Sequence, residues 1–363
     1  MTLLSRFVLL FLLANGSALA QDVGIIGGIE QSIKQTQPNT NLKFNAQSDT
    51  NTTITLLKIE LSEHAQRAIS QRVDQALQSN QSAVMYSNAP ASASQQKQLG
   101  MNNVPVLNQG QFGTCTTFAV TAAMDAFLGK GDYISQLCSL QLGNNLAKTT
   151  NQLSGWNGAF AQTVFAQFKT FGIFSQANQK KYGCGGLTTY PSWSIPTTDM
   201  SPDLYYQHSE SLDNNGIAWS SLLTQNQVFL DTTDMDTVVS DVKNALNTGH
   251  RVTFSVLLPR TDLGTGGAVG WHHYLDDTWM LTTDISNEIK SHKTLPGHEM
   301  VITGYDDRAV SMDTSGHRHH GLFTLRNSWG AYVADWGDFY MTYDYFKALA
   351  LEAQQVTPLT NKN

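Results

Sequence analysis

The stretch "NQGQFGTCTTFAVTAAMDAF", residues 108–127, joins a glycine-containing loop to an apolar run at Cys115, one of three cysteines in the chain. Phe118, Ala122 and Ala126 recur every four residues, and this spacing predicts a helix over 115–128. A thiol at a helix N-terminus has a lowered pKa and is a better nucleophile. The stretch leaves three interpretations of Cys115 open: a nucleophile, half of a disulfide, or a small buried residue.

Two polar residues further along the chain are candidates for partners of this thiol. His298 follows "LPG" and opens the strand pattern "EMVITGY", and Asn327 lies in "LRNSWG". An imidazole can act as the base for a thiol, and an amide can orient that imidazole. Cys115, His298 and Asn327 therefore form a candidate catalytic set.

Three blocks of sequence resemble the papain-like cysteine peptidases. The blocks "VPVLNQGQFGTCTTFA", "GHEMVITGYD" and "LRNSWGAYVADWGDFYM" resemble, in this order, that family's segments around its nucleophile, histidine and asparagine. The resemblance covers roughly residues 101–345. It implies an α+β fold of two lobes, with Cys115 on a helical lobe and His298 and Asn327 on an antiparallel β lobe. It also implies a secreted, bacterial-type peptidase that acts on proteins or peptides, without a cofactor or a metal.

The resemblance assigns further residues one by one. Gln109 matches the side-chain donor of the oxyanion hole, and Trp329 matches the indole that shields the histidine–asparagine bond. The residues that match the family's substrate-binding positions are Gly158, Ala159, Phe160, Ala161 and Glu299. Glu299 stands where the family usually has a small residue. Two interpretations of it stay open: it favours a basic substrate side chain, or it is solvated at the rim.

The cysteines depart from the family's pattern. Phe112 and Trp156 stand where the family has a disulfide, and we expect these two rings to pack as an aromatic pair. The resemblance implies a second disulfide, between Cys138 and Cys184, which leaves Cys115 as the free thiol in an oxidising compartment. The alternative is that Cys138 and Cys184 are both buried thiols.

The N-terminal residues have the pattern of a secretory signal. Arg6 precedes the apolar residues 7–14, and Ala18-Leu19-Ala20 is a small-residue cleavage pattern. A membrane anchor is the alternative, but a spanning helix needs ~20 apolar residues and this run ends at Asn15. We therefore expect cleavage after Ala20, secretion to the periplasm or the medium, and no membrane association of the processed protein.

Residues 21–100 are rich in Gln, Asn, Ser and Thr and differ in composition from the peptidase domain expected over 101–363. Strand patterns at 41–47 and 53–61 flank a turn at 48–52, and a helix over 62–80 follows, with Ser62 as its N-cap. A module of this kind cannot bury its apolar face alone, so we expect it to dock on the peptidase domain. It is either an inhibitory propeptide or a permanent part of the fold.

Within 101–363 the patterns predict helices over 157–171 and 234–249 and strands over 251–258, 297–307, 319–330 and 337–346. Residues 187–231 read as a long irregular loop. Two clusters, one at 272–277 with His272, His273, Asp276 and Asp277 and one at 317–320, contain histidines without a metal-binding spacing. We interpret both clusters as solvated turns.

The composition excludes some classes of function. Charged residues make up 14% of the chain, the net charge is −7, and no cluster of Lys and Arg indicates a nucleic-acid partner. A hydrophobic content of 41% is enough for one large domain or two lobes, and we expect a monomer. Two other functions remain open: a papain-fold binding protein without activity, and an acyltransferase or deamidase with the same catalytic set.

Overall fold

The computed structural model describes residues 22–38, 47–83, 95–150, 154–230, 232–274 and 276–360. The signal peptide expected at 1–20 and residues 41–46 of the strand expected at 41–47 lie outside these residues. The helices are α2 (Glu63–Ala83), α3 (Cys115–Leu128), α4 (Gln136–Thr149), α5 (Ala161–Phe171), α6 (Gln176–Tyr182), α7 (Pro202–Gln207), α8 (Gln225–Val228), α9 (Met235–Asn247), α10 (Thr283–Ser291) and α11 (Tyr343–Leu349). The strands are β1 (Val23–Pro38), β2 (Gln47–Leu61), β3 (Gln96–Gln98), β4 (Ile217–Leu223), β5 (Arg251–Leu257), β6 (Gly270–Trp271), β7 (Thr278–Trp279), β8 (Thr294–Asp313), β9 (Arg318–Arg326), β10 (Asp338–Thr342) and β11 (Ala350–Pro358).

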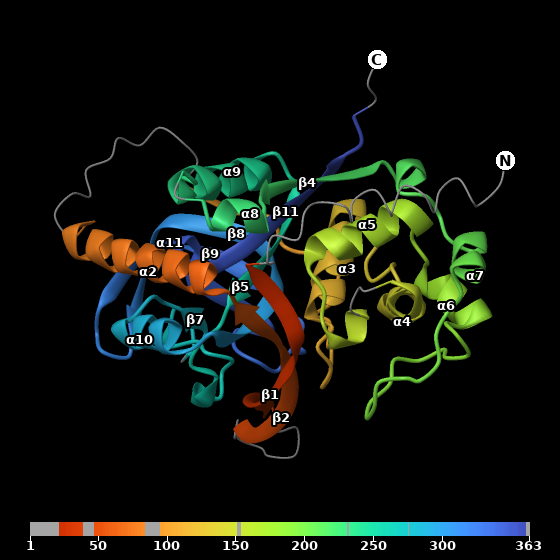
Figure 1. Ribbon diagram of the computed structural model, residues 1–363, viewed down its shortest axis with the longest axis horizontal. Helices are drawn as coiled ribbons and strands as arrows, with labels where there is room; N and C mark the ends of the chain where they lie inside the picture. Colours follow the sequence, from red (N-terminus) through yellow and green to blue (C-terminus); the bar gives the residue numbers. More distant parts are fainter. Residues whose placement is uncertain are drawn as a thin grey trace.

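The two lobes predicted from the sequence are both present. Helices α3 to α7 form one lobe, and the strands with α2 and α8 to α11 form the other (Figure 1). The described strands form one sheet, in which β8 pairs antiparallel with β5 on one side and with β9 on the other. Each lobe has its own apolar core. Helix α3 carries Cys115 and strand β8 carries His298, so these two candidate catalytic residues come from different lobes.

The N-terminal module docks on the β lobe, as its one apolar face predicts. Strands β1 and β2 form an antiparallel hairpin, and residues 57–60 of β2 pair with residues 294–297 of β8. Ala65, Ile69 and Val73 of α2 are all fully buried. Figure 1 shows the hairpin in front of the junction and α2 across the face of the β lobe. The module therefore extends the sheet of the β lobe and shares its core.

A half-buried arginine fixes α2 in place. The Arg72 Nε donates to the backbone oxygen of Lys347, at 3.0 Å, at the C-terminal end of α11. Burial lowers the pKa of Arg72 to about 10. The partial negative charge of the last carbonyls of a helix stabilises the guanidinium there. This contact joins the N-terminal module to a residue 275 positions later in the chain.

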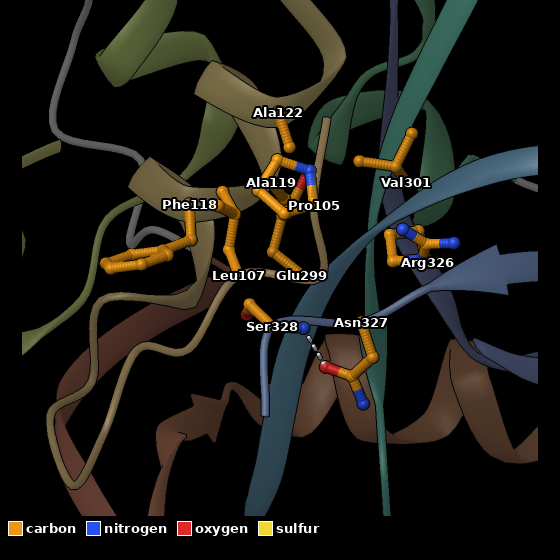
Figure 2. A pocket seen from close by; sticks show the side chains of 10 residues that line it. All are labelled: Pro105, Leu107, Phe118, Ala119, Ala122, Glu299, Val301, Arg326, Asn327 and Ser328. Carbon is orange, nitrogen blue, oxygen red and sulfur yellow. Dashed lines mark hydrogen bonds between the residues drawn. The ribbon is translucent and has the colours of Figure 1, made fainter. Parts of the chain in front are cut away.

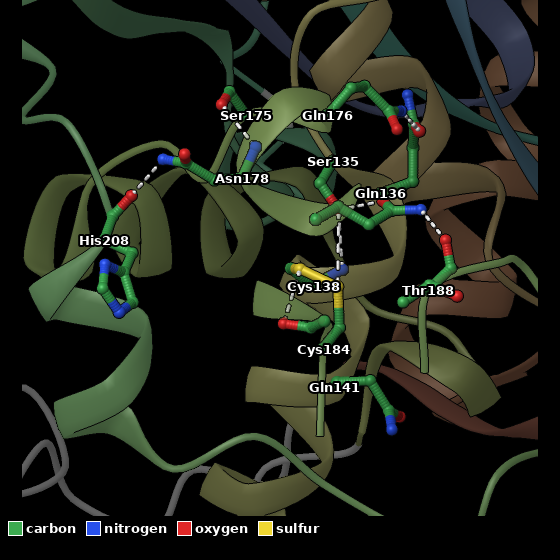
Figure 3. Close-up of a disulfide and its surroundings, with 12 residues drawn as sticks. Ser135, Gln136, Cys138, Gln141, Ser175, Gln176, Asn178, Cys184, Thr188 and His208 are labelled. Atoms are coloured by element: carbon green, nitrogen blue, oxygen red, sulfur yellow. Dashed lines mark hydrogen bonds between the residues drawn. A yellow bond between two sulfur atoms is a disulfide. The ribbon is translucent and has the colours of Figure 1, made fainter. Parts of the chain in front are cut away.

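The predicted disulfide between Cys138 and Cys184 is confirmed. Cys138 lies in the first turn of α4, where its N–H donates to the Ser135 hydroxyl, 2.9 Å away, and Cys184 follows α6 (Figure 3). The bridge closes a loop of 46 residues and fixes α4 to α6 inside the helical lobe. Cys115 is the free cysteine of the described residues.

The aromatic pair that we expected in place of the family's other disulfide is also confirmed. The ring centroids of Phe112 and Trp156 lie 5.3 Å apart in an edge-to-face arrangement, and Tyr190 packs on both rings. Trp156 is 1% exposed, and its Nε1 donates to Gln141. This cluster holds the loop before α3 against the helical lobe without a covalent bond.

We predict that Trp156→Ala lowers the free energy of unfolding by about 3–5 kcal/mol, since the substitution leaves a large cavity. Urea unfolding followed by circular dichroism measures this difference. Trp193, which is 87% exposed, is the matched control, and Trp193→Ala should change the free energy by about 0.5 kcal/mol or less. Equal effects of the two substitutions would contradict the proposed role of the cluster.

Some expectations about secondary structure were wrong. The turn expected at 48–52 lies inside β2, and β1 was missed because its glycines and glutamines have low strand propensity. The pairing of β1 with β2 overrides that propensity. Residues 187–231 contain α7, β4 and α8 rather than loop alone. The strand expected over 337–346 ends at Thr342, and α11 begins at Tyr343.

Candidate active site

Cys115 is the first residue of α3, as predicted. Gly110, with a φ of +61°, makes the turn in the loop that leads to it. Cys115 is fully buried, and Glu299, the residue after His298, lies close enough to affect the pKa of the thiol. Burial raises the pKa of the thiol to about 12. The expected lowering by the helix N-terminus is therefore outweighed in this state, because desolvation disfavours the thiolate more strongly.

His298 and Asn327 are brought together as predicted. The His298 Nε2 lies 2.8 Å from the Asn327 Oδ1, and the Trp329 ring covers the imidazole with the ring centroids 4.7 Å apart. His298 is fully buried, and its Nδ1 has no hydrogen-bond partner within the described part of the chain. Burial lowers the pKa of His298 to about 4, so that the imidazole is neutral. The Nε2 of His298 is held by the Asn327 amide, and its Nδ1 is available to accept a proton.

Gln109 lies between the two lobes and is anchored at both ends of its amide. Its Oε1 accepts from the Ser328 hydroxyl at 2.8 Å, beside Asn327. Its Nε2 donates to the backbone oxygen of Phe112 at 2.8 Å and to that of Thr55 at 3.3 Å. Thr55 belongs to β2. A carbonyl of the N-terminal hairpin therefore accepts from the Gln109 Nε2, the group that the family resemblance assigns as a donor of the oxyanion hole.

The hairpin also packs against the loop that follows Gln109 and against Gly158. The Thr55 hydroxyl donates to the backbone oxygen of Gln111 at 2.6 Å. Gly158 has a φ of +102°, and a Cβ at that position would lie 2.6 Å from Leu57 Cδ2 and 3.1 Å from Ile25 Cγ2. The two hairpin side chains thus lie against the backbone that the sequence assigns to substrate binding. Cys115 and His298 are both fully buried.

The remaining substrate-binding candidates lie beside Gly158 at the start of α5. The Ala159 carbonyl accepts from the Thr116 hydroxyl at 2.6 Å, which links it to the residue after Cys115. Phe160 is the N-cap of α5, and the N–H of Ala161 donates to the Glu352 Oε1 at 2.6 Å. Glu352 was missed from the sequence; a carboxylate inside the apolar strand pattern "ALEAQQV" was the available signal.

Glu299 does not lie at a solvated rim, so that interpretation was wrong. The side chain is only 1% exposed. Burial raises its pKa well above the ordinary value, and the neighbouring Glu352 raises it further. The β lobe buries this carboxylate because its strand packs face-on against α3.

The two histidine clusters are not simple solvated turns. Asp277 is fully buried and accepts from the backbone N–H groups of His272, His273 and Tyr274 at 2.7, 3.0 and 2.8 Å. His319 is buried and bonded to Asp344. Both clusters stabilise loops of the β lobe. Across the described residues, no group of three or more His, Cys, Asp or Glu side chains is arranged to hold a metal.

The pKa of His298 leads to a prediction about stability. Between its ordinary value of 6.5 and the buried value of about 4, the unfolded chain binds a proton that the folded chain does not. Stability therefore falls as the pH is lowered through this window. We expect the free energy of unfolding of the wild type to fall more steeply from pH 6.5 to pH 4 than that of His298→Gln, which cannot titrate.

Urea unfolding at a series of pH values, followed by tryptophan fluorescence, measures the two curves. All other titrating groups are present in both proteins and cancel in the difference. The curves should run parallel above about pH 7, where the histidine is neutral in both states. Curves that stay parallel down to pH 4 would show that His298 is not desolvated.

No described helix has both the length and the apolar character that crossing a bilayer requires. No protein-family model and no curated protein matches the chain.

Solved structures of cysteine proteases do match it. Xylellain, a cysteine protease from Xylella fastidiosa, is 18% identical, with a TM-score of 0.45, over 74% of this chain and 88% of that one. The Amb a 11 cysteine protease, a major ragweed pollen allergen, in its proform is 14% identical, with a TM-score of 0.45, over 78% and 75%. Digestive procathepsin L 3 of the Tenebrio molitor larval midgut is 18% identical, with a TM-score of 0.42, over 76% and 72%. The chain is thus similar to papain-like cysteine proteases.

Proposed function

We propose that this chain is a secreted papain-like cysteine peptidase made as an inactive precursor. In this proposal residues 1–20 are a signal peptide, residues 21–100 are an inhibitory module with its linker, and residues 101–363 are the peptidase domain. The arrangement of His298 on Asn327, with Gln109 bonded to the adjacent Ser328, carries the proposal. In the proposed reaction it supplies a base, its orienting group and an oxyanion donor for the thiol of Cys115.

The proposed reaction follows from these positions once the hairpin has left the groove. The Cys115 thiol passes its proton to the His298 Nδ1, and the sulfur attacks the carbonyl carbon of the scissile amide. The N–H of Cys115 and the Gln109 Nε2 donate to the oxygen that becomes negative. His298 then gives its proton to the leaving amine, and an acyl-enzyme remains. Water hydrolyses this thioester, with His298 again as the base.

The direction of β2 supports an inhibitory role for the hairpin. The Thr55 carbonyl accepts a hydrogen bond from the Gln109 Nε2, the proposed oxyanion donor. The side chain of Leu57, two residues later, lies against Gly158. In the proposed complex, Gly158 instead faces the substrate residue that precedes the scissile carbonyl. The hairpin thus runs through the groove in the direction opposite to a substrate. A segment in this direction fills the site without presenting an amide bond in the geometry needed for cleavage.

A thiol titration separates this proposal from the two other functions. The protein, before and after removal of the N-terminal module, is treated with an epoxide-type thiol inhibitor and then tested on casein and a peptide library. We expect labelling of Cys115 and hydrolysis after removal. An unlabelled Cys115 would favour a binding protein, and labelling without hydrolysis would favour acyl transfer or deamidation.

Mass spectrometry of the secreted form tests the precursor. We expect an N-terminus beyond the hairpin in the active protein. An active protein that begins at Gln21 would contradict a removable module.

A further inference from the structure

We infer that the Tyr190 hydroxyl is a positioning group for catalysis, because it holds the two ends of the loop that carries the oxyanion hole at a fixed spacing. This role rests on the proposed peptidase function and adds to it a residue outside the candidate catalytic set. Tyr190 lies in the segment 187–231, which the sequence pattern predicts to be loop, and no motif in the sequence marks it.

The Tyr190 hydroxyl bridges the start and the end of the loop 109–115. It donates to the backbone oxygen of Gln109 at 3.1 Å and lies 2.9 Å from the Thr114 Oγ1. Since the single proton of the phenol goes to Gln109, the Thr114 hydroxyl donates the second bond. Gln109 carries the proposed side-chain donor, and Thr114 directly precedes Cys115, whose N–H is the proposed backbone donor. One oxygen atom therefore joins the residues on which both donors depend.

The loop between these two ends needs such a restraint. Gly110 has a φ of +61°, and Phe112 stands where the family has a disulfide-bonded cysteine. Oxyanion donors act only within about 2.7–3.1 Å of the oxygen that becomes negative, so a small change in the span of the loop weakens both. The middle of the loop is held from the same side, since the Gln111 Nε2 donates to the backbone oxygen of Ser192 at 3.0 Å. Residues 190–192 thus fix the loop at three points.

The aromatic ring fixes the place of this hydroxyl. The ring of Tyr190 packs against those of Phe112, Phe118 and Trp156, with centroids 5.8, 5.3 and 5.5 Å away. Burial raises the pKa of Tyr190 above its ordinary value, so the hydroxyl keeps a proton to donate at neutral pH. The group is therefore both immobilised and able to donate.

The start of α3 shows that the bond to Tyr190 replaces an ordinary helix cap. Thr114 is the N-cap residue, and a threonine hydroxyl at this position commonly accepts from a backbone N–H of the first turn. Among the described residues the Thr114 side chain makes no such bond, and it contacts the Tyr190 hydroxyl instead. The cap hydroxyl thus does not occupy the helix end that the proposed reaction uses to stabilise negative charge.

Gln109 extends the restraint to the β lobe. Its Oε1 accepts from the Ser328 hydroxyl, and the Ser328 N–H donates to the Asn327 Oδ1 at 2.6 Å (Figure 2). Asn327 in turn holds His298. Because these groups act on the transition state rather than on the bound substrate, loss of the Tyr190 hydroxyl should change kcat and leave KM almost unaffected.

Tyr190→Phe in the processed enzyme removes the hydroxyl and keeps the ring. We expect kcat on a fluorogenic peptide to fall by about 10-fold, with KM within about 2-fold of the wild type. The matched control is Tyr205→Phe, which removes a buried hydroxyl that donates to the backbone oxygen of Gly172 at 3.2 Å, elsewhere in the helical lobe. It should retain the wild-type kcat. A wild-type kcat for Tyr190→Phe, a loss in KM alone, or equal losses in the two variants would overturn the role.

Thr114 tests the same bond from its other end. Thr114→Val keeps the shape of the side chain and removes its hydroxyl, so kcat should fall. Thr114→Ser retains a hydroxyl and should recover most of that loss. Equal kcat values for the valine and serine variants would contradict a role of the bond.

A double-variant cycle with Gln109→Ala separates positioning from a general effect on folding. Since Gln109→Ala removes a donor that the hydroxyl positions, adding Tyr190→Phe should cost clearly less in this background than in the wild type. Losses that simply multiply would show that the hydroxyl does not act through Gln109.

Two inhibitors give a readout that a purely structural role would not split. A peptide aldehyde places its oxygen in the oxyanion hole when Cys115 adds to it, and it should bind Tyr190→Phe about 10-fold more weakly than the wild type. The same peptide with a reduced amide bond lacks this oxygen and should bind both proteins equally. Weaker binding of both inhibitors, or of neither, would overturn the inference. Failure of the peptidase function would look different, since the wild type would hydrolyse no peptide.

Discussion

Replacement of Cys115 by alanine in the processed enzyme should lower kcat by about 10⁴-fold or more, because the covalent step has no other nucleophile. Cys115 is the free cysteine of the described residues, and it lies within a packed core at the start of α3. Alanine is compatible with the helix, and the substitution removes only the sulfur atom, so the fold should persist. Hydrolysis of a fluorogenic peptide gives kcat, and thermal unfolding confirms the fold.

His298→Ala should have a similar effect, and the double variant should be no worse than either single variant, since the two groups act as one unit. The matched control is His250→Gln, a half-buried histidine that bonds to Gln355 away from the groove. It should retain the wild-type kcat. A Cys115→Ala variant with more than about a tenth of the wild-type kcat would contradict covalent catalysis by this thiol.

Leu57→Asp in the unprocessed chain should release the hairpin from the groove and raise peptide hydrolysis by about 100-fold or more. The wild-type leucine is fully buried against Gly158. The substitution removes about 2 kcal/mol of apolar burial and places an unpaired carboxylate in an apolar site, which costs several kcal/mol more. Both costs fall on the docked state alone, so the equilibrium shifts towards an open groove. Initial rates are measured while mass spectrometry confirms that the chain is still intact.

The control is Ile26→Asp, which makes the same kind of change on the same hairpin. Ile26 is 48% exposed, so its replacement costs the docked state little. This variant should stay as inactive as the wild-type precursor. Activation by both substitutions, or by neither while both remain folded, would contradict the position of Leu57 in the groove.

The sequence predicts the local structure around the candidate catalytic residues because each lies at a point where local rules act strongly. Helix α3 begins at Cys115 since a turn-forming glycine loop meets an uninterrupted apolar run there. His298 and Asn327 lie in or next to β-branched and aromatic strand patterns, which fix their strands. The pairing of Phe112 with Trp156 follows from two matched departures from the family's pattern.

The errors arise where long-range contacts decide the outcome. Strand β1 has a weak local pattern and forms because β2 pairs with it. Glu299 carries no sequence signal that separates a solvated rim from a buried face, since its burial depends on α3 packing over β8. The raised pKa of Cys115 likewise depends on its burial in the folded chain, which no local pattern contains.

The central claim is that the N-terminal hairpin covers a competent nucleophile, and the labelling rate of Cys115 tests it most directly. The full chain and the chain freed of its module by limited proteolysis are treated with the same epoxide-type inhibitor, and the labelled peptide is mapped by mass spectrometry. We predict that Cys115 reacts at least about 100-fold faster once the module is gone, with the Cys138–Cys184 disulfide intact. Equal rates in the two forms, or no reaction of Cys115 in either, would contradict it.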